Sequence, residues 1–389
     1  MRIAIVGAGP AGTWASILLA RRGHAVTLID PQAPWEKPCG GGVTAKALSS
    51  FGIFESDLPR KYIDRITIYF SDKRSVTVAT QQPIAVLSRR DLGKYLIDEA
   101  EKAGVSIVRS RVTSVEPKSR GWTLSTRDTS LQSDFLIGAD GATSLVRRTV
   151  ATALQPEDLC VTLGYFIRAD GPPQMKIYFV PDFEGYIWSF PRPNHISYGL
   201  ITRGIPGWTG RAKMLLSNFI LADLGADLLE QAEFYSAPVP CLGPSAWKKN
   251  QIAGDRWALV GDAAGLADPI TGEGIYFALK SAELLADSIE APAQYQTKVW
   301  QEIGVELSRA SRMYKRFYNG RFLAGDFKKR TVQLSQRSRT LRTILGNLIA
   351  GNQSYVGLKK KLLFFLLLPL NRLNIFFLQK PFHMMEGRN

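Results

Sequence analysis

Residues 2–30 read RIAIVGAGPAGTWASILLARRGHAVTLID, and they carry the strongest structural signal in the sequence. The apolar segment 2–6 is typical of a short buried strand, and Gly7, Gly9 and Gly12 follow it with the spacing G-x-G-x-x-G. In that spacing the first glycine permits a tight turn, the second lets the backbone approach a pyrophosphate, and the third lets the next helix pack closely on the strand. The stretch therefore predicts a dinucleotide-binding loop between a strand and a helix.

The residues after this loop extend the pattern. Residues 14–22 favour a helix that Gly23 stops, and the strand expected over residues 25–29 ends in Asp30. A carboxylate at the end of that strand accepts hydrogen bonds from the ribose of an adenosine and repels a 2′-phosphate. The order strand, loop, helix, strand and acid argues against a chance match, and it predicts a dinucleotide other than NADP.

Composition limits the class of protein. The chain has 389 residues, of which 45% are hydrophobic and 21% charged, and this is typical of a packed globular protein with two domains or one interrupted domain. The three cysteines are too few and too scattered for a disulfide framework, which favours a reducing, cytoplasmic setting. Three histidines without paired ligands predict no metal site, and residues 1–6 do not resemble a cleaved signal peptide.

The positive charge is concentrated toward the C-terminus. The formal net charge is +15, and residues 309–389 hold 17 Lys and Arg but 2 Asp and Glu. Lys359, Lys360 and Lys361 precede the apolar run LLFFLLLPL, residues 362–370, which falls short of the roughly 20 residues that span a bilayer. We expect this region to contact an anionic membrane surface, with a C-terminal helix packed on the body as the alternative. Nucleic acid is not an expected partner, because the apolar run has no role in binding it.

Two later segments carry further motifs. Residues 134–140 (DFLIGAD) read as a strand that closes on Gly141, and residues 257–260 read as a strand followed by GDAAG, residues 261–265. Both motifs resemble signatures of FAD-dependent enzymes of the p-hydroxybenzoate hydroxylase fold. The resemblance implies FAD as the cofactor, with Asp262 holding its ribityl chain.

Two more segments extend this resemblance. DPITGEGI, residues 268–275, leads into an apolar helix over residues 276–289, whose N-terminal N–H groups are suited to face negative charge on a reduced flavin. Arg89, in the pattern R-x-x-L-x-x-x-L, resembles the family's cofactor-contacting arginine, and an ordinary surface arginine is the alternative. The cofactor-binding residues that the resemblance implies are Gly7, Gly9, Ala11, Gly12, Asp30, Cys39, Gly40, Gly42, Arg89, Val112, Asp140, Gly261, Asp262, Pro269, Gly272, Gly274 and Ile275.

Two motifs resemble one branch of this family, the geranylgeranyl reductases. KPCGGG, residues 37–42, resembles the branch's Cys-Gly-Gly loop, and YIWSFP, residues 186–191, matches its Tyr-x-Trp-x-Phe-Pro motif. With the 268–275 loop, the likeness covers about residues 1–290. It implies a reductase that adds a flavin hydride and a proton to isolated C=C bonds of a polyprenyl lipid, quinone or diphosphate.

The resemblance also makes Cys39 the candidate catalytic residue. Its thiol is a candidate proton donor, and a structural role beside the flavin is the alternative. Cys160 and Cys241 read as small buried residues. Because no second glycine-rich nucleotide fold is visible, we expect electrons from NADPH that docks transiently or from a ferredoxin-like partner protein.

An aromatic pattern supports an apolar substrate independently. Tyr186, Trp188 and Phe190 are spaced by two in a segment that reads as a strand over residues 185–191, so they project from one face. Such a wall suits a polyprenyl chain, which is positioned by shape and dispersion, and a sheet face packed in the core is the alternative. The polar tips of Tyr186 and Trp188 need partners in a dry core, which favours a substrate pocket.

The middle of the chain reads as a second domain. Alternating apolar residues predict an antiparallel sheet with a helix on it, from strands at 65–70, 159–168, 175–180 and 196–201, a helix at 213–224 and turns at 237–244. The predicted fold class is α/β (α+β), with a Rossmann-like FAD-binding domain, an inserted antiparallel β-sheet substrate domain and a helical, basic C-terminal region. The predicted boundaries are 1–60, 88–150 and 250–290 for the first, 61–87 and 151–249 for the second, and 291–389 for the third.

Two other functions stay open. A monooxygenase or halogenase has the same fold, but hydroxylases of this fold often have a histidine where this chain has Gly265, and halogenases carry a Trp-x-Trp-x-Ile-Pro motif from which Tyr186 and Phe190 depart. Halogenases also need a reactive lysine, for which the candidates are Lys46, Lys61 and Lys73. The third hypothesis is a flavoprotein that has lost catalysis and serves as a membrane-bound binding partner.

Overall fold

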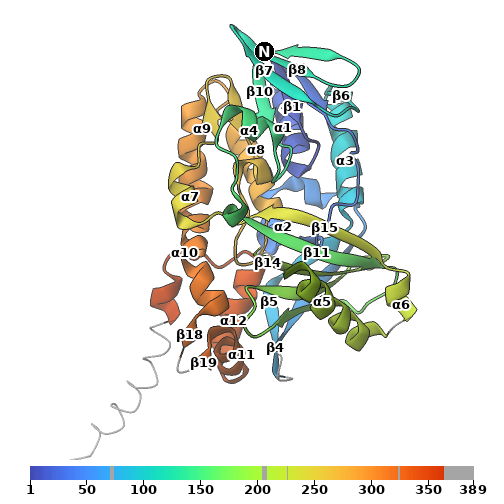
Figure 1. The fold of residues 1–389 in the computed structure, drawn as a ribbon, viewed down its shortest axis with the longest axis vertical. Helices are drawn as coiled ribbons and strands as arrows, with labels where there is room; N and C mark the ends of the chain where they lie inside the picture. The colour runs from blue at the N-terminus through green and yellow to red at the C-terminus, as the bar shows by residue number, and fades with distance from the viewer. Residues whose placement is uncertain (71–73, 204–207, 226, 323–324, 363–389) are drawn as a thin grey trace, which may run out of the picture.

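A six-stranded sheet forms the upper part of the molecule in the computed structural model (Figure 1), which describes residues 1–70, 74–203, 208–225, 227–322 and 325–362. The strands lie in the order β16-β17-β10-β1-β2-β6 and are parallel except at β16. They span Arg2–Val6 (β1), Ala25–Ile29 (β2), Ser106–Val108 (β6), Phe135–Gly138 (β10), Ala253–Gly254 (β16) and Trp257–Leu259 (β17).

Helix α1 (Pro10–Arg21) packs on this sheet beside α3 (Arg89–Lys102) and α8 (Ile275–Ala286). Two glycines make the close packing possible. Gly7 has φ +103°, and a Cβ atom on Gly12 would lie 2.0 Å from the carbonyl oxygen of Gly7. The predicted strand, loop and helix are confirmed, and with them the Rossmann-like part of the fold.

An eight-stranded sheet lies below, in the order β15-β11-β14-β13-β12-β4-β5-β3. Its strands are β3 (Gly42–Val43), β4 (Arg60–Phe70), β5 (Arg74–Leu87), β11 (Leu159–Ile167), β12 (Met175–Phe179), β13 (Gly185–Pro191), β14 (Ile196–Arg203) and β15 (Glu233–Pro240). The expectation of a wholly antiparallel sheet is wrong at one pair, because β12 runs parallel to β4. These two strands come from distant parts of the chain, so no hairpin forces them to be antiparallel.

The turns predicted at 237–244 are wrong in part, since residues 237–240 belong to β15. Pro238 and Pro240 suggested a turn, but β15 is an edge strand, where a residue without an N–H group costs no hydrogen bond on the open side. Cys241 follows the strand, and its N–H group donates to the carbonyl oxygen of Asp158 at 2.7 Å.

Helices cover both faces of the larger sheet. Helix α5 (Trp208–Leu224) packs on one face, and the other is covered by α10 (Val305–Asn319), α11 (Phe327–Arg337) and α12 (Arg339–Ile349). Helix α12 lies tightly on β5, because a Cβ atom on Gly346 would be 2.5 Å from the carbonyl oxygen of Ala79. The C-terminal helices therefore complete the core of the larger sheet.

The remaining elements connect these layers. Two of them are small sheets, one of β7 (Ser114–Lys118), β8 (Gly121–Ser125) and β9 (Ser130–Ser133) and one of β18 (Arg321–Phe322) and β19 (Gly325–Asp326). The further helices are α2 (Ala45–Ser50), α4 (Leu145–Val150), α6 (Asp227–Glu230), α7 (Pro244–Lys249) and α9 (Pro292–Val299). There are also 3₁₀ turns at Gly52–Glu55, Pro156–Asp158 and Gly261–Ala264 and a π-helical turn at Trp300–Gly304. Among the described residues, no helix has both the length and the apolarity that crossing a membrane requires. Residues 363–370 of the apolar run lie outside the described part of the chain.

Candidate functional site

The glycine loop fits a dinucleotide pyrophosphate. Gly9 caps α1, Pro10 occupies its first position, and a Cβ atom on Gly9 would have no described atom within 4 Å. The N–H groups of the first turn of α1 have no partner within the helix, and the space beside Gly9 is open, so this helix end suits an anion. Ala11 is buried and lies against Gly261, since a Cβ atom on Gly261 would be 2.9 Å from that of Ala11.

Asp30 is held in place at the end of β2. Its Oδ2 accepts the N–H group of Ala8 at 2.9 Å, and its Oδ1 accepts those of Gln32 and Ala33 at 2.8 and 2.9 Å. These bonds fix the carboxylate beside the glycine loop, where it can accept ribose hydroxyls. Val112 is buried in the hydrophobic core of the same domain.

Arg89 differs from an ordinary surface arginine. It is the first residue of α3 and is 8% exposed, and its Nε has no hydrogen-bond partner among the described residues. A buried guanidinium N–H group without a partner is costly, and an anionic cofactor would satisfy it. The orphaned Arg89 Nε and the open N-terminus of α1 are the two observations that fit FAD.

Asp140 supports helix α4. Its carboxylate accepts the Ser144 hydroxyl and the N–H groups of Leu145 and Val146, the last two at 2.7 and 3.1 Å. Burial raises the pKa of Asp140 despite these bonds. The structure therefore gives its side chain a helix-capping role, while its backbone lies against Gly7, whose Cβ atom would be 2.8 Å from the Asp140 Cα.

Asp262 lies on the turn after β17 and forms an ion pair with Lys37, whose Nζ is 2.7 Å from Asp262 Oδ2. Lys37 belongs to the loop that carries Cys39, so this pair joins two of the predicted cofactor segments. Gly274 completes the junction, because its Cβ atom would be 3.5 Å from Asp262 Oδ1. Lys37 is absent from the sequence-based set of site residues, because a lysine before the motif gives no signal of its own.

The 268–275 loop is held by three tyrosine hydroxyls. Tyr186 donates to the carbonyl oxygen of Thr271 at 2.5 Å, Tyr318 to that of Ile270 at 2.6 Å, and Tyr355 to Asp268 Oδ2 at 2.9 Å. These bonds flank Pro269 and precede Gly272, which has φ +73°. Tyr318 and Tyr355 come from the C-terminal region, where no sequence motif could have pointed to them.

Glu273 is a titratable group at the end of this loop. Its Oε1 accepts the N–H group of Tyr276 at 2.8 Å, in the first turn of α8, and Ile275 is the buried first residue of that helix. The pKa of Glu273 is raised to about 7, mainly by burial and in part by the charge of Asp268, against the lowering effects of the Tyr276 N–H group and Arg89. A carboxyl group that carries a proton near neutral pH therefore lies beside the predicted flavin loop.

The three aromatic residues of β13 share one face, as the strand periodicity predicts. Ring centroids are 5.9 Å apart for Tyr186 and Trp188, and 6.3 Å apart for Trp188 and Phe190. Phe179 and Phe317 extend the row. The ring centroid of Phe179 lies 6.5 Å from that of Tyr186, and the centroid of Phe317 lies 5.7 Å from that of Phe179. The row forms an apolar path from β13 to α10.

The cysteine loop lies against this aromatic row. A Cβ atom on Gly40 would be 2.4 Å from Cδ2 of Phe190, and one on Gly42 would be 3.5 Å from its Cε2. Cys39 is partly exposed, and its Sγ accepts the N–H group of Gly41 at 3.3 Å. The structure therefore brings together the predicted catalytic residue and the predicted substrate-binding face.

The polar tips of this face have protein partners. Trp188 is 5% exposed, and its Nε1 donates to the Ser197 hydroxyl at 3.4 Å. Tyr186 bonds to the 268–275 loop, so neither tip needs a ligand as its partner. Trp188 accordingly contributes to the core as well as to the wall.

The other two cysteines lie together in the core cluster that also contains Trp188. Cys160 and Cys241 are buried, and the hydrogen bond between their thiols and their burial raise the pKa of Cys160. Nη2 of Arg203 lies 3.7 Å from Cys241 Sγ.

Two of the three lysines considered for a halogenase have partners among the described residues. Lys46 Nζ lies 4.0 Å from the centroid of the Tyr276 ring, and Lys61 forms an ion pair with Asp170. Lys73 lies outside the described residues.

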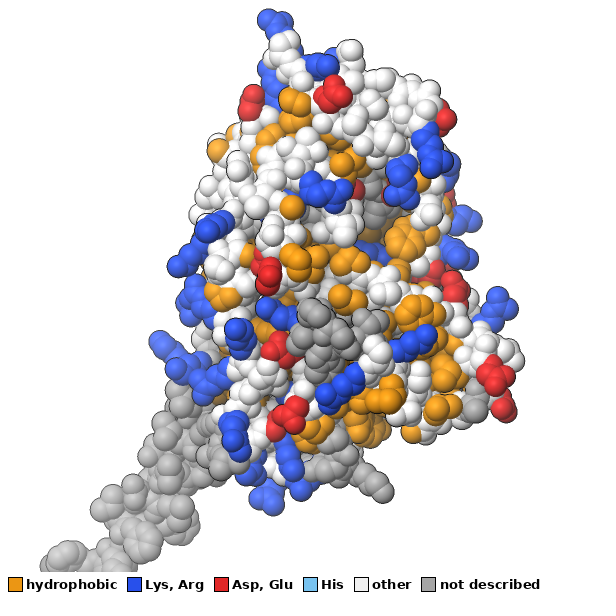
Figure 2. All heavy atoms as spheres, viewed as in Figure 1, with side chains coloured by type: hydrophobic (Ala, Val, Ile, Leu, Met, Phe, Trp, Pro, Cys, Tyr) orange, Lys and Arg blue, Asp and Glu red, His pale blue; other side chains and the backbone are white. Residues whose placement is uncertain are grey.

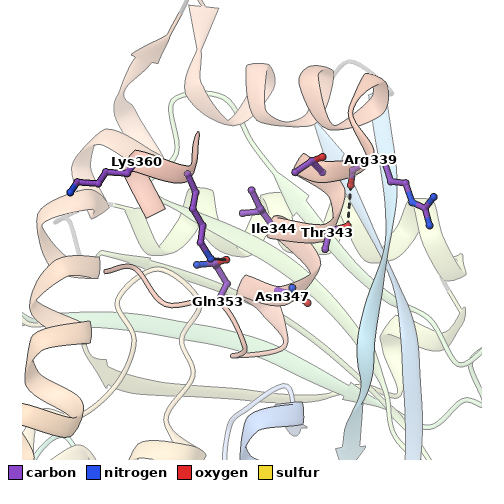
Figure 3. Close-up of a pocket in the computed structure, with 8 residues that line it drawn as sticks. Arg339, Thr343, Ile344, Asn347, Gln353 and Lys360 are labelled. Atoms are coloured by element: carbon purple, nitrogen blue, oxygen red, sulfur yellow. Dashed lines mark hydrogen bonds between the residues drawn. The ribbon is translucent and has the colours of Figure 1, made fainter. Parts of the chain in front are cut away.

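A hollow of about 790 Å³ lies apart from this site, between α12 and residues 353–361 (Figure 3). Its lining residues are Arg339, Thr340, Thr343, Ile344, Asn347, Gln353, Lys360 and Lys361. In Figure 3, Lys360 and Arg339 lie at opposite ends of the view, with Gln353 and Asn347 between them. None of the site residues predicted from the sequence lines this hollow.

Comparison with known proteins agrees with this geometry. The family profile described as FAD binding domain matches residues 1–298. The chain belongs to this FAD-binding family. It is 28% identical over 372 residues to geranylgeranyl diphosphate reductase of Synechocystis sp., with 87% of each chain covered. It is 27% identical over 343 residues to digeranylgeranylglycerophospholipid reductase 2 of Methanothermobacter thermautotrophicus, covering 80% of this chain and 86% of the relative.

The solved structure of a geranylgeranyl bacteriochlorophyll reductase-like protein from Thermoplasma acidophilum shares the fold. It superposes with a TM-score of 0.75 at 23% sequence identity, covering 93% of this chain and 98% of that one. The predicted fold class, the FAD cofactor and the likeness to geranylgeranyl reductases are confirmed, and the protein is an FAD-dependent oxidoreductase. The monooxygenase or halogenase alternative is not favoured.

Proposed function

We propose that the protein hydrogenates isolated carbon–carbon double bonds of a geranylgeranyl-type chain carried by a lipid, a quinone or a diphosphate. The observation that carries the proposal is the contact between the cysteine loop and the aromatic row, with Gly40 against Phe190 and Trp188. Relatives named for the reduction of geranylgeranyl groups support the same substrate class.

One set of site residues would bind the cofactor, and another would bind the substrate. FAD, when bound and reduced, supplies a hydride for one carbon of the double bond. The N-terminus of α1, Asp30 and Asp262 would hold its pyrophosphate, ribose and ribityl groups, and Arg89 would meet its negative charge. The aromatic row positions the apolar chain by dispersion and excludes water.

The second carbon of the double bond needs a proton. Cys39 carries a partly exposed thiol on the loop that touches the aromatic row, and we assign proton delivery to it. Glu273 lies beside the 268–275 loop with a pKa of about 7, so a second proton carrier is available at this site.

The electron donor and the location complete the proposal. One glycine-rich nucleotide loop is present in the sequence, so reducing equivalents come from NADPH that docks transiently or from a ferredoxin-like protein. We place the protein in the cytoplasm, bound peripherally to an anionic membrane surface. Lys and Arg side chains gather at the lower end of the face in Figure 2, and the exposed cations of the C-terminal region include Arg312, Lys315, Arg316, Arg321, Arg337, Arg339, Lys359, Lys360 and Lys361.

A substrate panel tests the proposal. The purified protein, reduced with dithionite without oxygen, is incubated separately with geranylgeranyl diphosphate, a digeranylgeranyl glycerophospholipid and a prenylated quinone, and products are weighed by mass spectrometry. We expect at least one substrate to gain hydrogens in pairs. A panel without any mass gain, together with an oxygenated or halogenated product in air, would overturn the proposal.

A further inference from the structure

Arg192 directly follows β13 and is fully buried, with 0% exposure. It is the residue after the Tyr-x-Trp-x-Phe-Pro motif, so the end of the aromatic row fixes its backbone. Its N–H group donates to the carbonyl oxygen of His195 at 2.8 Å, in the turn that leads to β14. A guanidinium stays charged in a protein, so one at this depth requires partners on every side.

Among the described residues, the Arg192 side chain has its polar partners on the cysteine loop and on Glu36, just before that loop. Its Nη2 donates to the carbonyl oxygen of Cys39 at 2.5 Å and its Nε to that of Gly40 at 3.3 Å, while its Nη1 forms an ion pair with Glu36. The guanidinium plane also lies over Phe166, 4.9 Å from the ring centroid. One side chain at the end of β13 therefore binds Glu36, Cys39 and Gly40 together.

Glu36 links Arg192 to the flavin domain through hydrogen bonds. Its carboxylate accepts the Ser88 hydroxyl at 2.5 Å and the N–H group of Arg89 at 2.9 Å, at the N-terminus of α3. Burial raises the pKa of Glu36, but the charge of Arg192 and these hydrogen bonds outweigh it, so the pKa lies below its ordinary value. The ion pair thus joins β13, the cysteine loop and the helix that begins with Arg89.

The rest of the loop backbone is also fixed. The carbonyl oxygen of Cys39 accepts a second hydrogen bond, from the Ser197 hydroxyl at 2.9 Å, and that of Gly41 accepts the N–H group of Leu87 at 3.0 Å. Gly41 has φ +81°, and a Cβ atom there would be 2.7 Å from Arg192 Nε. These bonds hold the backbone carbonyl groups of Cys39, Gly40 and Gly41, while the Cys39 side chain is partly exposed and accepts the Gly41 N–H group.

We propose that Arg192, through its ion pair with Glu36 and its bonds to the carbonyl groups of Cys39 and Gly40, is the positioning residue that fixes the Cys39 thiol relative to the flavin and the aromatic row. The inference rests on the proposed function, since it assigns the Cys39 loop to prenyl reduction. It goes beyond that function because it explains the position of the thiol by a residue at the end of β13.

The test uses the FAD-loaded full-length protein with Arg192→Gln, Arg192→Lys and Ser197→Ala. Ser197→Ala removes one of the two donors to the Cys39 carbonyl group without leaving a buried charge unpaired, so it serves where an Arg192 variant fails to fold. Arg203→Gln is the matched control, because Arg203 is a half-buried arginine of the same sheet whose described contacts are with Cys241 and Tyr314.

Two quantities are measured for each variant. The first is the rate at which iodoacetamide alkylates Cys39, which is the one partly exposed cysteine of the chain. The second is the pair kcat and KM for prenyl reduction. We expect Arg192→Gln to raise the alkylation rate at least about threefold, because a released loop samples more open conformations. We also expect kcat to fall at least about tenfold with KM nearly unchanged, since the reacting groups are misplaced while the substrate wall stays intact.

The conservative variant and the control separate positioning from folding. Arg192→Lys keeps the charge opposite Glu36 but loses the forked donors, so its kcat should lie between those of Arg192→Gln and the wild type. Ser197→Ala should change the alkylation rate and kcat in the same directions as Arg192→Gln, by a smaller factor. Alkylation and kcat that stay at wild-type values in Arg192→Gln and Ser197→Ala would overturn the proposal. A wild-type protein without reductase activity would instead refute the proposed function, and the alkylation rates would still report on the loop.

Discussion

The hydroxyl of Tyr355 donates a hydrogen bond of 2.9 Å to Asp268, and this bond ties the C-terminal region to the loop at the start of α8. Asp268 is buried, and its other carboxylate oxygen accepts the N–H groups of Ile270 and Thr271. Burial raises the pKa of Asp268, so each hydrogen bond to its charged form offsets part of a desolvation cost. The C-terminal region thereby helps to hold the 268–275 loop, the predicted cofactor loop.

Replacing Tyr355 with Phe should therefore weaken both folding and FAD binding. Loss of a hydrogen bond to a buried carboxylate should lower the free energy of unfolding by about 1–3 kcal/mol. FAD titration followed by flavin fluorescence and urea unfolding measure the two effects. Tyr62→Phe is the control, since Tyr62 is 55% exposed. Equal behaviour of the two variants would contradict a role for the Tyr355 bond.

Gly40→Ala tests the contact between the cysteine loop and the aromatic row. The new methyl group would lie 2.4 Å from Cδ2 of Phe190, so the loop or the ring must move. We expect FAD to stay bound and kcat/KM for a prenyl substrate to fall about 10- to 100-fold. Gly52→Ala adds the same methyl group where no described atom lies within 4 Å, and it should be neutral. If the Gly40→Ala and Gly52→Ala enzymes were equally active, the contact between Gly40 and Phe190 would have no role in activity.

Glu273→Gln should change how stability depends on pH. The pKa of Glu273 is raised from 4.5 to about 7 in the folded protein, so the folded state binds its proton more tightly than the unfolded chain does. The resulting stability is present below pH 4.5 and is lost as the pH rises through about 7. Relative to Glu273→Gln, the wild type should thus lose at most about 3 kcal/mol between about pH 5 and about pH 8.

Urea unfolding of the FAD-free proteins at these two pH values measures this difference. Glu101→Gln changes an exposed carboxyl group and should follow the wild type. Parallel pH profiles for the wild type and Glu273→Gln would show that Glu273 titrates as an ordinary carboxyl group.

Neutralising Lys359, Lys360 and Lys361 with Gln should weaken binding to anionic vesicles. Each charge near such a surface contributes about 1 kcal/mol, so loss of the three should cost about 3 kcal/mol and lower the affinity about 150-fold. Vesicle sedimentation at low salt measures it, with Gln in place of the exposed Lys94, Lys248 and Lys249 as the matched control. These substitutions are preferable to cutting the chain near residue 320, because α11 and α12 pack on the larger sheet. If the two triple variants reduced vesicle binding equally, net charge and not the C-terminal surface would determine binding.

Much of the flavin domain could be predicted from the sequence because its signals are local. The spacing of Gly7, Gly9 and Gly12 encodes a turn and a close helix–strand contact within a few residues, and the structure contains both. The alternation of Tyr186, Trp188 and Phe190 predicts their common face in the same way. Local patterns of this kind depend on geometry that neighbouring residues impose on one another.

The missed features depend on contacts between distant parts of the chain. Arg192 reaches Glu36 across more than 150 residues, and Tyr355 reaches Asp268 from a region without a recognisable motif. The parallel pairing of β12 with β4 is likewise set by the tertiary arrangement. No periodicity or spacing within either partner reveals such contacts, so the structure is needed to find them.

If the proposed function is right, the reduced flavin of this protein passes its hydride to an isolated double bond. The most direct measurement is anaerobic: the bound flavin is reduced with dithionite, excess reductant is removed, a geranylgeranyl lipid is added, and flavin reoxidation and product mass are followed together. We expect reoxidation without oxygen, accompanied by gains of two hydrogens per double bond. A flavin that stays reduced until oxygen is admitted, with the lipid unchanged in mass, would contradict it.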